Sequence, residues 1–149
     1  MSPPVLRAAR STDAGAVGAI LSAFIDDTAW MPRVYTRAED LSFAGDMIDR
    51  GWVTVAEANA RVAGFAARDG AEVHALYLAA GARRQGIGSA LLRAMQAQVD
   101  ALNLWTFQAN RGAQAFYAAH GFVPAETTDG AGNDQGLPDL RMTWKREAA

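Results

Sequence analysis

Apolar residues recur at two different spacings along the chain, and each spacing predicts a different element. In the first, five of them fall three or four positions apart, as on one face of an α-helix. These are Val17, Ile20, Leu21, Phe24 and Ile25. Ser11-Thr12-Asp13 precedes them with residues that favour helix N-caps. We therefore predict a short strand over Val5–Arg10 followed by a helix.

In the second spacing, apolar and polar residues alternate, which is typical of β-strands. Three such stretches follow one another: Trp52–Ala58, Arg61–Arg68 and Ala71–Ala79. The turn-forming pairs Asn59-Ala60 and Asp69-Gly70 separate them. The pattern predicts a meander of three consecutive antiparallel strands.

Capping signals place the remaining elements. Thr36-Arg37-Ala38-Glu39 has the form of a capping box and predicts a helix that Gly51 ends. Asn110 can cap a helix that Gly121 ends. The other predicted elements are a helix over roughly Gly86–Leu102, a strand at Leu104–Gln108, a helix at Arg111–His120, and a terminal hairpin of Phe122–Glu126 and Leu140–Lys145. Because a helix connects them, the strand at Leu104–Gln108 should run parallel to the strand before it, which makes the sheet mixed.

Composition limits the classes of function. The 149 residues are the size of one domain, and the sequence has no cysteine and only two histidines, which excludes thiolate chemistry and makes a metal site improbable. A formal net charge of -2 without a long basic run argues against nucleic acid. The first residues lack a signal-peptide pattern, and no apolar run approaches the ~18 residues that span a bilayer. We expect a cytoplasmic protein without membrane or nucleic-acid partners.

The most informative stretch is Arg83-Arg84-Gln85-Gly86-Ile87-Gly88-Ser89, between a predicted strand and a predicted helix. Two glycines one residue apart let the backbone approach a ligand closely and direct several NH groups at it. The helix N-terminus and the two arginines favour an anion such as a phosphate. The alternative is that Gly86 and Gly88 only permit a tight turn.

Two familiar phosphate-binding motifs do not fit this stretch. A nucleotide-triphosphate loop requires Lys followed by Ser or Thr directly after its last glycine, whereas Ser89-Ala90 follows Gly88. A dinucleotide-binding fold requires an acidic residue about 20 residues further on, where this chain has Asn103-Leu104.

The stretch instead matches the pattern Arg/Gln-x-x-Gly-x-Gly/Ala, through Arg83, Gly86 and Gly88, and resembles the GCN5-related N-acetyltransferase (GNAT) family. A second family motif occurs at the expected separation: Asn110-Arg111-x-Ala113-x-x-Phe116-Tyr117-x-x-x-Gly121-Phe122. The order of elements resembles the family along essentially the whole chain. The resemblance implies one α/β domain over residues 1–149, with a mixed, mostly antiparallel sheet of about seven strands, about four helices, and a splay between strands 4 and 5.

The resemblance also implies roles for particular residues. In the family, the glycine loop holds the pyrophosphate of acetyl-coenzyme A (acetyl-CoA), and the pantetheine arm pairs with the fourth strand as an added strand would. The expected contacts are Leu76, Tyr77, Leu78, Arg83, Arg84, Gln85, Gly86, Ile87, Gly88, Ser89, Asn110 and Phe116. The alternative role for Asn110 is to cap the helix that follows it. The chain departs from the family motif at one place: a proline normally follows the fourth strand, where this chain has Ala79-Ala80.

For the chemistry, Tyr117 matches the tyrosine that in the family donates a proton to the departing thiolate. A backbone NH of the fourth strand would polarise the thioester carbonyl. Glu72 and His74 share one face of that strand by the period of two, and either is a candidate for the base that takes the amine proton. The alternative is that both only face solvent or a neighbouring strand.

The resemblance predicts transfer of an acetyl group from acetyl-CoA to a primary amine of a small molecule or peptide, by a monomer or homodimer without a metal. The alternative is a binding module, either a sensor or an interaction domain, that holds acyl-CoA without transferring the acyl group. The acceptor is left open. Residues 26–52 and 127–139 differ among family members according to acceptor, and the aromatic residues Trp30 and Tyr35 either line an acceptor pocket or pack on the core.

Overall fold

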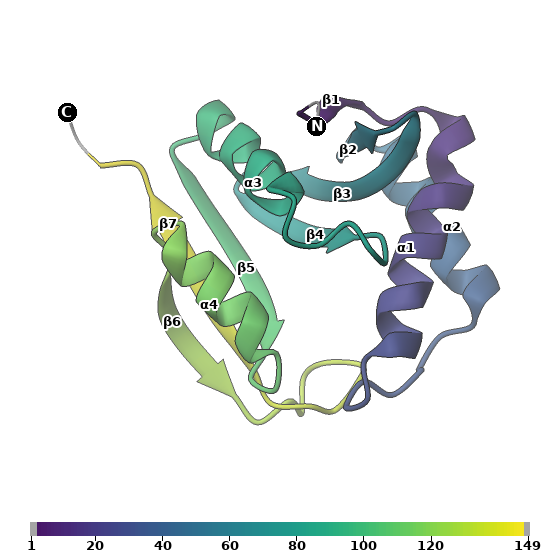
Figure 1. Ribbon diagram of the computed structural model, residues 1–149. Coiled ribbons are helices and arrows are strands. Elements are labelled where there is room, and N and C mark those ends of the chain that lie inside the picture. The colour runs from purple at the N-terminus through teal and green to yellow at the C-terminus, as the bar shows by residue number, and fades with distance from the viewer. Residues whose placement is uncertain (1–2, 148–149) are drawn as a thin grey trace.

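The computed structural model describes residues 3–147, so the first and last two residues of the predicted domain lie outside it (Figure 1). Along the chain the elements are β1 (Val5–Ala8), the one-turn helix η1 (Ser11–Asp13), α1 (Ala14–Asp27), α2 (Arg37–Asp49), β2 (Val53–Ala58), β3 (Arg61–Asp69), β4 (Glu72–Leu78), α3 (Ile87–Gln98), β5 (Ala101–Phe107), α4 (Arg111–Ala119), β6 (Val123–Thr128) and β7 (Asp139–Lys145). Among residues 3–147, no helix is both long and apolar enough to cross a membrane.

The seven strands form one sheet in the order β1-β2-β3-β4-β5-β7-β6. Every neighbouring pair is antiparallel except β4 and β5, which are parallel. The predicted mixed sheet of seven strands with four α-helices is therefore confirmed. Two apolar clusters form the core on its two faces, one beneath α1 and α2 and the other beneath α3 and α4.

The pairing between β4 and β5 is very short. Only Glu72 and Asn103 are in register, and Figure 1 shows the two strands running apart beyond this point. The predicted splay between strands 4 and 5 is confirmed. It leaves the edge of β4 that faces β5 without a strand partner among residues 3–147 for most of its length.

Local signals account for most helix ends. Thr36 Oγ1 accepts a hydrogen bond from the Glu39 NH at 3.1 Å, and Glu39 Oε1 accepts one from the Thr36 NH at 3.0 Å, which confirms the predicted capping box of α2. Gly51 and Gly121 follow α2 and α4 with φ of 76° and 90°, values that glycine adopts without strain.

Several predicted boundaries were wrong, among them the start of β5 (Ala101 rather than Leu104) and the end of β6 (Thr128 rather than Glu126), and two others have a clear local cause. The helix expected to run to Leu102 ends at Gln98, because Val99 is extended (φ -139°) and Ala101–Phe107 instead forms β5 with Leu102 and Leu104 buried. The first strand ends at Ala8 rather than Arg10, because the Arg10 NH donates to Asp13 Oδ2 at 2.7 Å and starts the turn of η1.

Candidate functional site

The splay between β4 and β5 opens onto a cavity of about 310 Å³. It is lined from β4, from the loop after it, and from α1, α3 and α4. The lining residues are Phe24, Leu76, Tyr77, Leu78, Arg83, Gly88, Asn110, Gly112, Ala113, Phe116 and Tyr117. The structure thus brings the predicted strand segment Leu76–Leu78, part of the glycine loop, Asn110, Phe116 and Tyr117 to one cleft.

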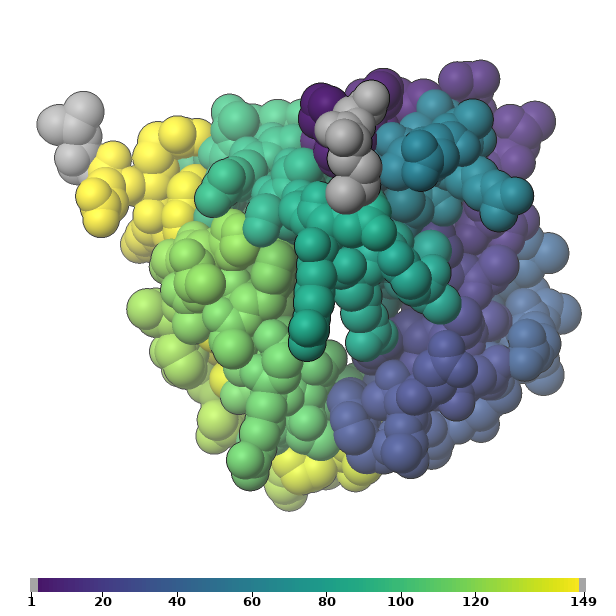
Figure 2. Space-filling model, in the orientation of Figure 1, coloured from purple at the N-terminus to yellow at the C-terminus, as the bar shows by residue number. Residues whose placement is uncertain are grey.

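The glycine loop forms the N-terminus of α3 at the mouth of this cleft. Gly86 is the N-cap in a left-handed conformation (φ 77°, ψ 6°), and a Cβ placed on it would meet no atom within 4 Å. The first turn of a helix has backbone NH groups without intrahelical partners, so an exposed N-terminus suits an anion. In Figure 2 side chains of the teal loop that follows β4 project forward between the green and the purple-blue parts of the molecule.

Gly88 has a different environment from Gly86. It is buried, and a Cβ on it would lie 3.3 Å from Phe116 Cζ and 3.8 Å from Leu78 Cδ1. Gly88 therefore lets α3 approach α4 and β4 closely, and it forms part of the cavity wall. The two glycines of the motif serve two purposes: one shapes the exposed turn, and the other permits close packing behind it.

The other predicted loop residues do not line the cavity. Arg84 is exposed, and Gln85 donates to the Gly81 carbonyl at 3.0 Å. Ile87 is buried in the core, so only its backbone can contribute. Ser89 Oγ lies 3.0 Å from His120 Nε2, which joins the first turn of α3 to the end of α4.

Asn110 takes the role of a helix cap and also borders the cleft. Its Oδ1 accepts from the Ala113 NH at 3.0 Å, which satisfies one free NH of α4. It lines the cavity together with Phe116, one helical turn and a half further on. The cap is observed, and a contact with a cofactor stays a prediction.

Tyr117 projects from α4 into the cleft and is only 8% exposed. Burial raises its pKa well above the ordinary value for tyrosine, and nearby Tyr77 raises it further. Burial likewise raises the pKa of Tyr77, whose ring packs on Phe24 with centroids 4.7 Å apart. Both phenols are therefore neutral hydrogen-bond donors at physiological pH.

A β-bulge in β4 determines where the two candidate bases lie. Ala67 and Arg68 of β3 pair with Ala75 and Val73, so His74 has no partner on β3. Such an extra residue shifts the alternation of the strand. Leu76 accordingly packs with the α3 and α4 cluster, while Ala75 belongs to the cluster under α1 and α2.

His74 and Glu72 differ in their relation to the cleft. His74 stacks on Trp52, with centroids 4.7 Å apart and planes at 9°, and it lines a narrow cavity of about 80 Å³ that Tyr117 also lines. Glu72 lies at the paired end of β4, opposite Asn103, and lines neither cavity; both Glu72 and His74 are exposed. Their roles stay predictions, and the geometry favours His74.

Sequence reasoning missed several residues that face the cleft. Phe24 of α1 lines both cavities, and Trp105, Thr106 and Phe107 of β5 line the narrow one. Trp105 is 46% exposed although it adjoins the buried Leu104. An aromatic residue at the polar phase of an alternating strand is a signal that could have identified it.

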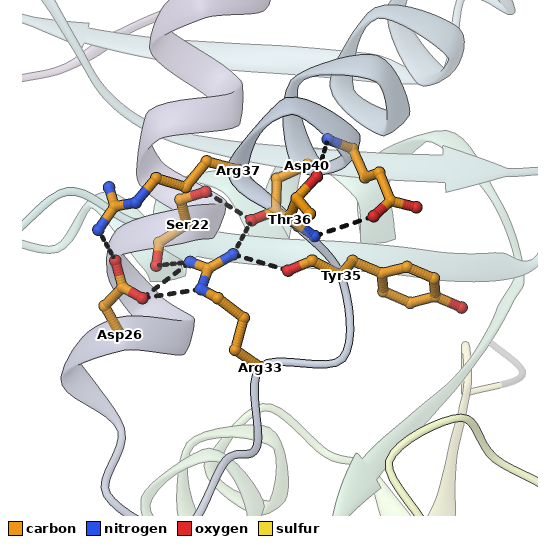
Figure 3. Close-up of polar contacts among 8 residues, drawn as sticks. Ser22, Asp26, Arg33, Tyr35, Thr36, Arg37 and Asp40 are labelled. Atoms are coloured by element: carbon orange, nitrogen blue, oxygen red, sulfur yellow. Dashed lines mark hydrogen bonds and ion pairs between the residues drawn. The ribbon is translucent and has the colours of Figure 1, made fainter.

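The segment between α1 and α2 is irregular but held by charges (Figure 3). Asp40 is 1% exposed; Ser22 Oγ donates to it, and Arg33 Nη1 donates to it at 2.8 Å. The Arg33 guanidinium also donates to Asp26 and to the Tyr35 carbonyl, and hydrogen bonds with Asp40 and Asp26 raise its pKa. From this segment Trp30 packs edge-on against Phe107, with centroids 5.7 Å apart.

The sheet is opened between two parallel strands, and an arginine-bearing glycine loop lies beside the opening. The model of the acetyltransferase (GNAT) domain matches residues 49–124, which is just over half of the chain. The chain therefore belongs to the GNAT acetyltransferase family. The match begins at the end of α2 and includes β4, the glycine loop and α4.

Solved structures show the same fold over nearly the whole chain. The apo form of YjaB from Escherichia coli is 20% identical, with a TM-score of 0.81 over 99% of this chain and 100% of that one. A GCN5-related N-acetyltransferase from Rhodopseudomonas palustris is 21% identical, with a TM-score of 0.82 over 97% of each chain. The yncA protein from Salmonella typhimurium, solved with its cofactor acetyl-CoA, is 21% identical, with a TM-score of 0.74 over 99% of this chain and 96% of that one. No curated protein sequence matches the chain.

Proposed function

We propose that the protein transfers the acetyl group of acetyl-CoA to a primary amine by direct attack in a ternary complex. The observation that carries the proposal is that an exposed helix N-terminus, the unpaired edge of β4 and the hydroxyl-bearing Tyr117 all border one cleft. The family and the acetyl-CoA-bound structure of yncA support acetyl-CoA as co-substrate.

Each part of the cleft fits one part of that co-substrate. The open N-terminus of α3 at Gly86, with Arg83 beside it, suits a pyrophosphate. The free edge of β4 at Leu76–Leu78 has backbone groups available for an extended amide-bearing arm. A β4 backbone NH then stabilises the negative charge that develops on the thioester oxygen.

The reaction must remove one proton from the amine and stabilise the negative charge on the departing sulfur. The amine nitrogen attacks the thioester carbonyl carbon, the new C–N bond forms, and the C–S bond breaks with its electron pair on sulfur. The amine loses a proton to a base, for which His74 is better placed than Glu72 because it lines the narrow cavity with Tyr117. Tyr117 donates a hydrogen bond to the departing sulfur; its raised pKa makes full transfer of its own proton unfavourable.

The test is a screen for free coenzyme A, released from acetyl-CoA in the presence of amines of several classes: arylalkylamines, amino acids, polyamines, aminoglycosides and peptide N-termini. Release that depends on an amine, with the acetylated amine identified by mass spectrometry, supports the proposal. Tight binding of acetyl-CoA without release for any amine class would instead support the non-catalytic acyl-CoA-binding module.

The base is tested separately by comparing His74→Gln with Glu72→Gln. We expect the histidine variant to lose most of kcat, while the glutamate variant keeps it. The reverse pattern would assign the base to Glu72.

A further inference from the structure

A third cavity, of about 480 Å³, opens next to the narrow one. Its lining comes from β5, from the ends of β6 and β7, and from the loop between them. These residues are Trp105, Thr106, Phe107, Thr128, Gly132, Asn133 and Asp139. Trp105, Thr106 and Phe107 also line the narrow cavity that Tyr117 and His74 border. The large cavity therefore shares the β5 part of its wall with the narrow one, and its volume is in the usual range for small-molecule sites.

Aromatic side chains dominate one wall of this cavity. Trp105 lines the cavity and is 46% exposed, although most tryptophans are largely buried. Phe107 packs edge-on against Trp30, with ring centroids 5.7 Å apart. An exposed indole beside a phenyl ring favours a ligand with an apolar, flat body, because covering these rings removes apolar surface from water.

The charge of the cavity is negative. Asp139 is the only ionisable residue in its lining. Its oxygens accept from neutral groups, the Thr128 hydroxyl and the Asn133 amide (3.2 Å for the latter), and among residues 3–147 no cation forms an ion pair with it. Arg141, two residues further along β7 and opposite Trp105 in the β5–β7 pairing, donates to Asn103 Oδ1 at 2.9 Å and is not part of the lining. A cationic ligand complements the Asp139 carboxylate, and a carboxylate on the ligand is repelled by it.

We propose that this cavity is the acceptor pocket and that it selects arylalkylamines, that is, primary amines that carry one positive charge on an aromatic body without a carboxylate. The inference rests on the proposed acetyl transfer. Asp139 attracts the ammonium form, the ring covers Trp105, and the neutral amine enters the gap past Thr106 and Phe107. Amino acids carry a carboxylate, which Asp139 repels. Polyamines lack the ring and carry more positive charges than one carboxylate can balance.

The test compares kcat/KM for 2-phenylethylamine, L-phenylalanine, spermidine and a peptide with a free N-terminus, all at saturating acetyl-CoA. We expect 2-phenylethylamine to exceed each of the others by about tenfold or more, since charge repulsion and lost ring contacts each oppose them. Equal or better kcat/KM for phenylalanine, spermidine or the peptide would overturn the inference and leave the acetyltransferase proposal standing.

Substitutions of residues that line the cavity provide a second test of the proposal. Asp139→Asn should raise KM for 2-phenylethylamine by about three- to tenfold, and the effect should shrink with added salt. Glu126→Gln is the matched control, because it removes a nearby exposed carboxylate outside the lining. Trp105→Ala should raise KM for 2-phenylethylamine more than KM for propylamine, which has no ring.

Acetyl-CoA affinity and thermal melting of each variant show that the fold and the cofactor cleft persist. If no amine supports turnover, the pocket is tested by calorimetry, which measures the binding of 2-phenylethylamine to the wild-type protein and to Asp139→Asn. Binding that the substitution weakens supports the pocket, and no binding, or equal binding to both, refutes it.

Discussion

Replacing Tyr117 with phenylalanine removes one hydroxyl from the cleft and leaves the ring in place. The ring packs against Phe116 and Phe122, with centroids 5.3 Å and 5.4 Å away, and these contacts do not involve the hydroxyl. We therefore expect the free energy of unfolding to change by less than about 1 kcal/mol.

The effect on turnover should be much larger. A hydrogen bond to a charged group contributes about 1.5–3 kcal/mol, and the sulfur acquires its negative charge only as the C–S bond breaks. At about 1.4 kcal/mol per factor of ten, Tyr117→Phe should lower kcat about 10- to 150-fold. The dissociation constant of acetyl-CoA should change little, because the thioester sulfur in the ground state is a weak acceptor.

The measurement is kcat at saturating amine and acetyl-CoA, with the acetyl-CoA dissociation constant from calorimetry. Tyr77→Phe is the matched control, since Tyr77 lines the same cavity and its burial also raises its pKa. An unchanged kcat in Tyr117→Phe would remove this hydroxyl from the mechanism, and a loss confined to Tyr77→Phe would transfer the role to Tyr77.

Because its raised pKa keeps Tyr117 protonated, wild-type kcat should not fall from ionisation of this group at any pH below about 10. The sign follows from its role: the donor is the protonated form, and a raised pKa extends that form to higher pH. A loss of kcat between pH 8 and 9 in the wild type that Tyr117→Phe abolishes would contradict the burial argument.

Three further predictions concern the cofactor loop and the fold. Gly86→Ala places a side chain at φ 77° in open space, so it should lower the melting temperature by about 2–4 °C through backbone strain of roughly 1 kcal/mol, whereas Gly45→Ala in the open interior of α2 should not lower it. Arg83→Gln should weaken acetyl-CoA binding about tenfold, with less effect at high salt, while Arg93→Gln on the exposed side of α3 leaves it unchanged; calorimetry at two salt concentrations measures both. The Arg7 hydrogen bonds hold the pKa of Asp13 at about 2, below its ordinary value, so the stability that this pair contributes is complete above about pH 4 and is lost as the pH falls toward 2; acid unfolding of Asp13→Asn should lack that part of the pH dependence.

Local patterns were sufficient to predict most of the fold. The capping box at Thr36 and the glycine after α4 are signals within one turn of the residues that they affect, so they act in the same way in any context. The end of α3 carries no such signal. Neither glycine nor proline follows Gln98, and only the long-range pairing of β5 with β7 determines that Ala101 and Leu102 belong to a strand.

The glycine turn beside the cleft was predictable for a similar reason. A glycine-rich turn between a strand and a helix is a contiguous segment, and its chemistry follows from the backbone. The bulge in β4 was not predictable, because it depends on how β3 pairs. The period of two alone determined the predicted face of Glu72 and His74; in the structure the bulge interrupts the alternation at His74, which stacks on Trp52, while Leu76 packs with the α3 and α4 cluster.

The proposed acceptor side could not be read from the sequence, because the loop that lines the large cavity is irregular and is held partly by a second irregular segment far away in the chain. The segment after α1 is held by Arg33 on the buried Asp40, and the loop before β7 is held by hydrogen bonds from Asn133 to Leu137 and Asp139. Tyr35 of the first segment donates to Asp134 of the second, a contact between residues 99 positions apart. Neither segment has an apolar period, so their order comes from charge pairs and hydrogen bonds that no local pattern reveals. Because these contacts lie apart from the glycine loop, changes in the two segments can alter the acceptor pocket while the acetyl-CoA cleft stays as it is.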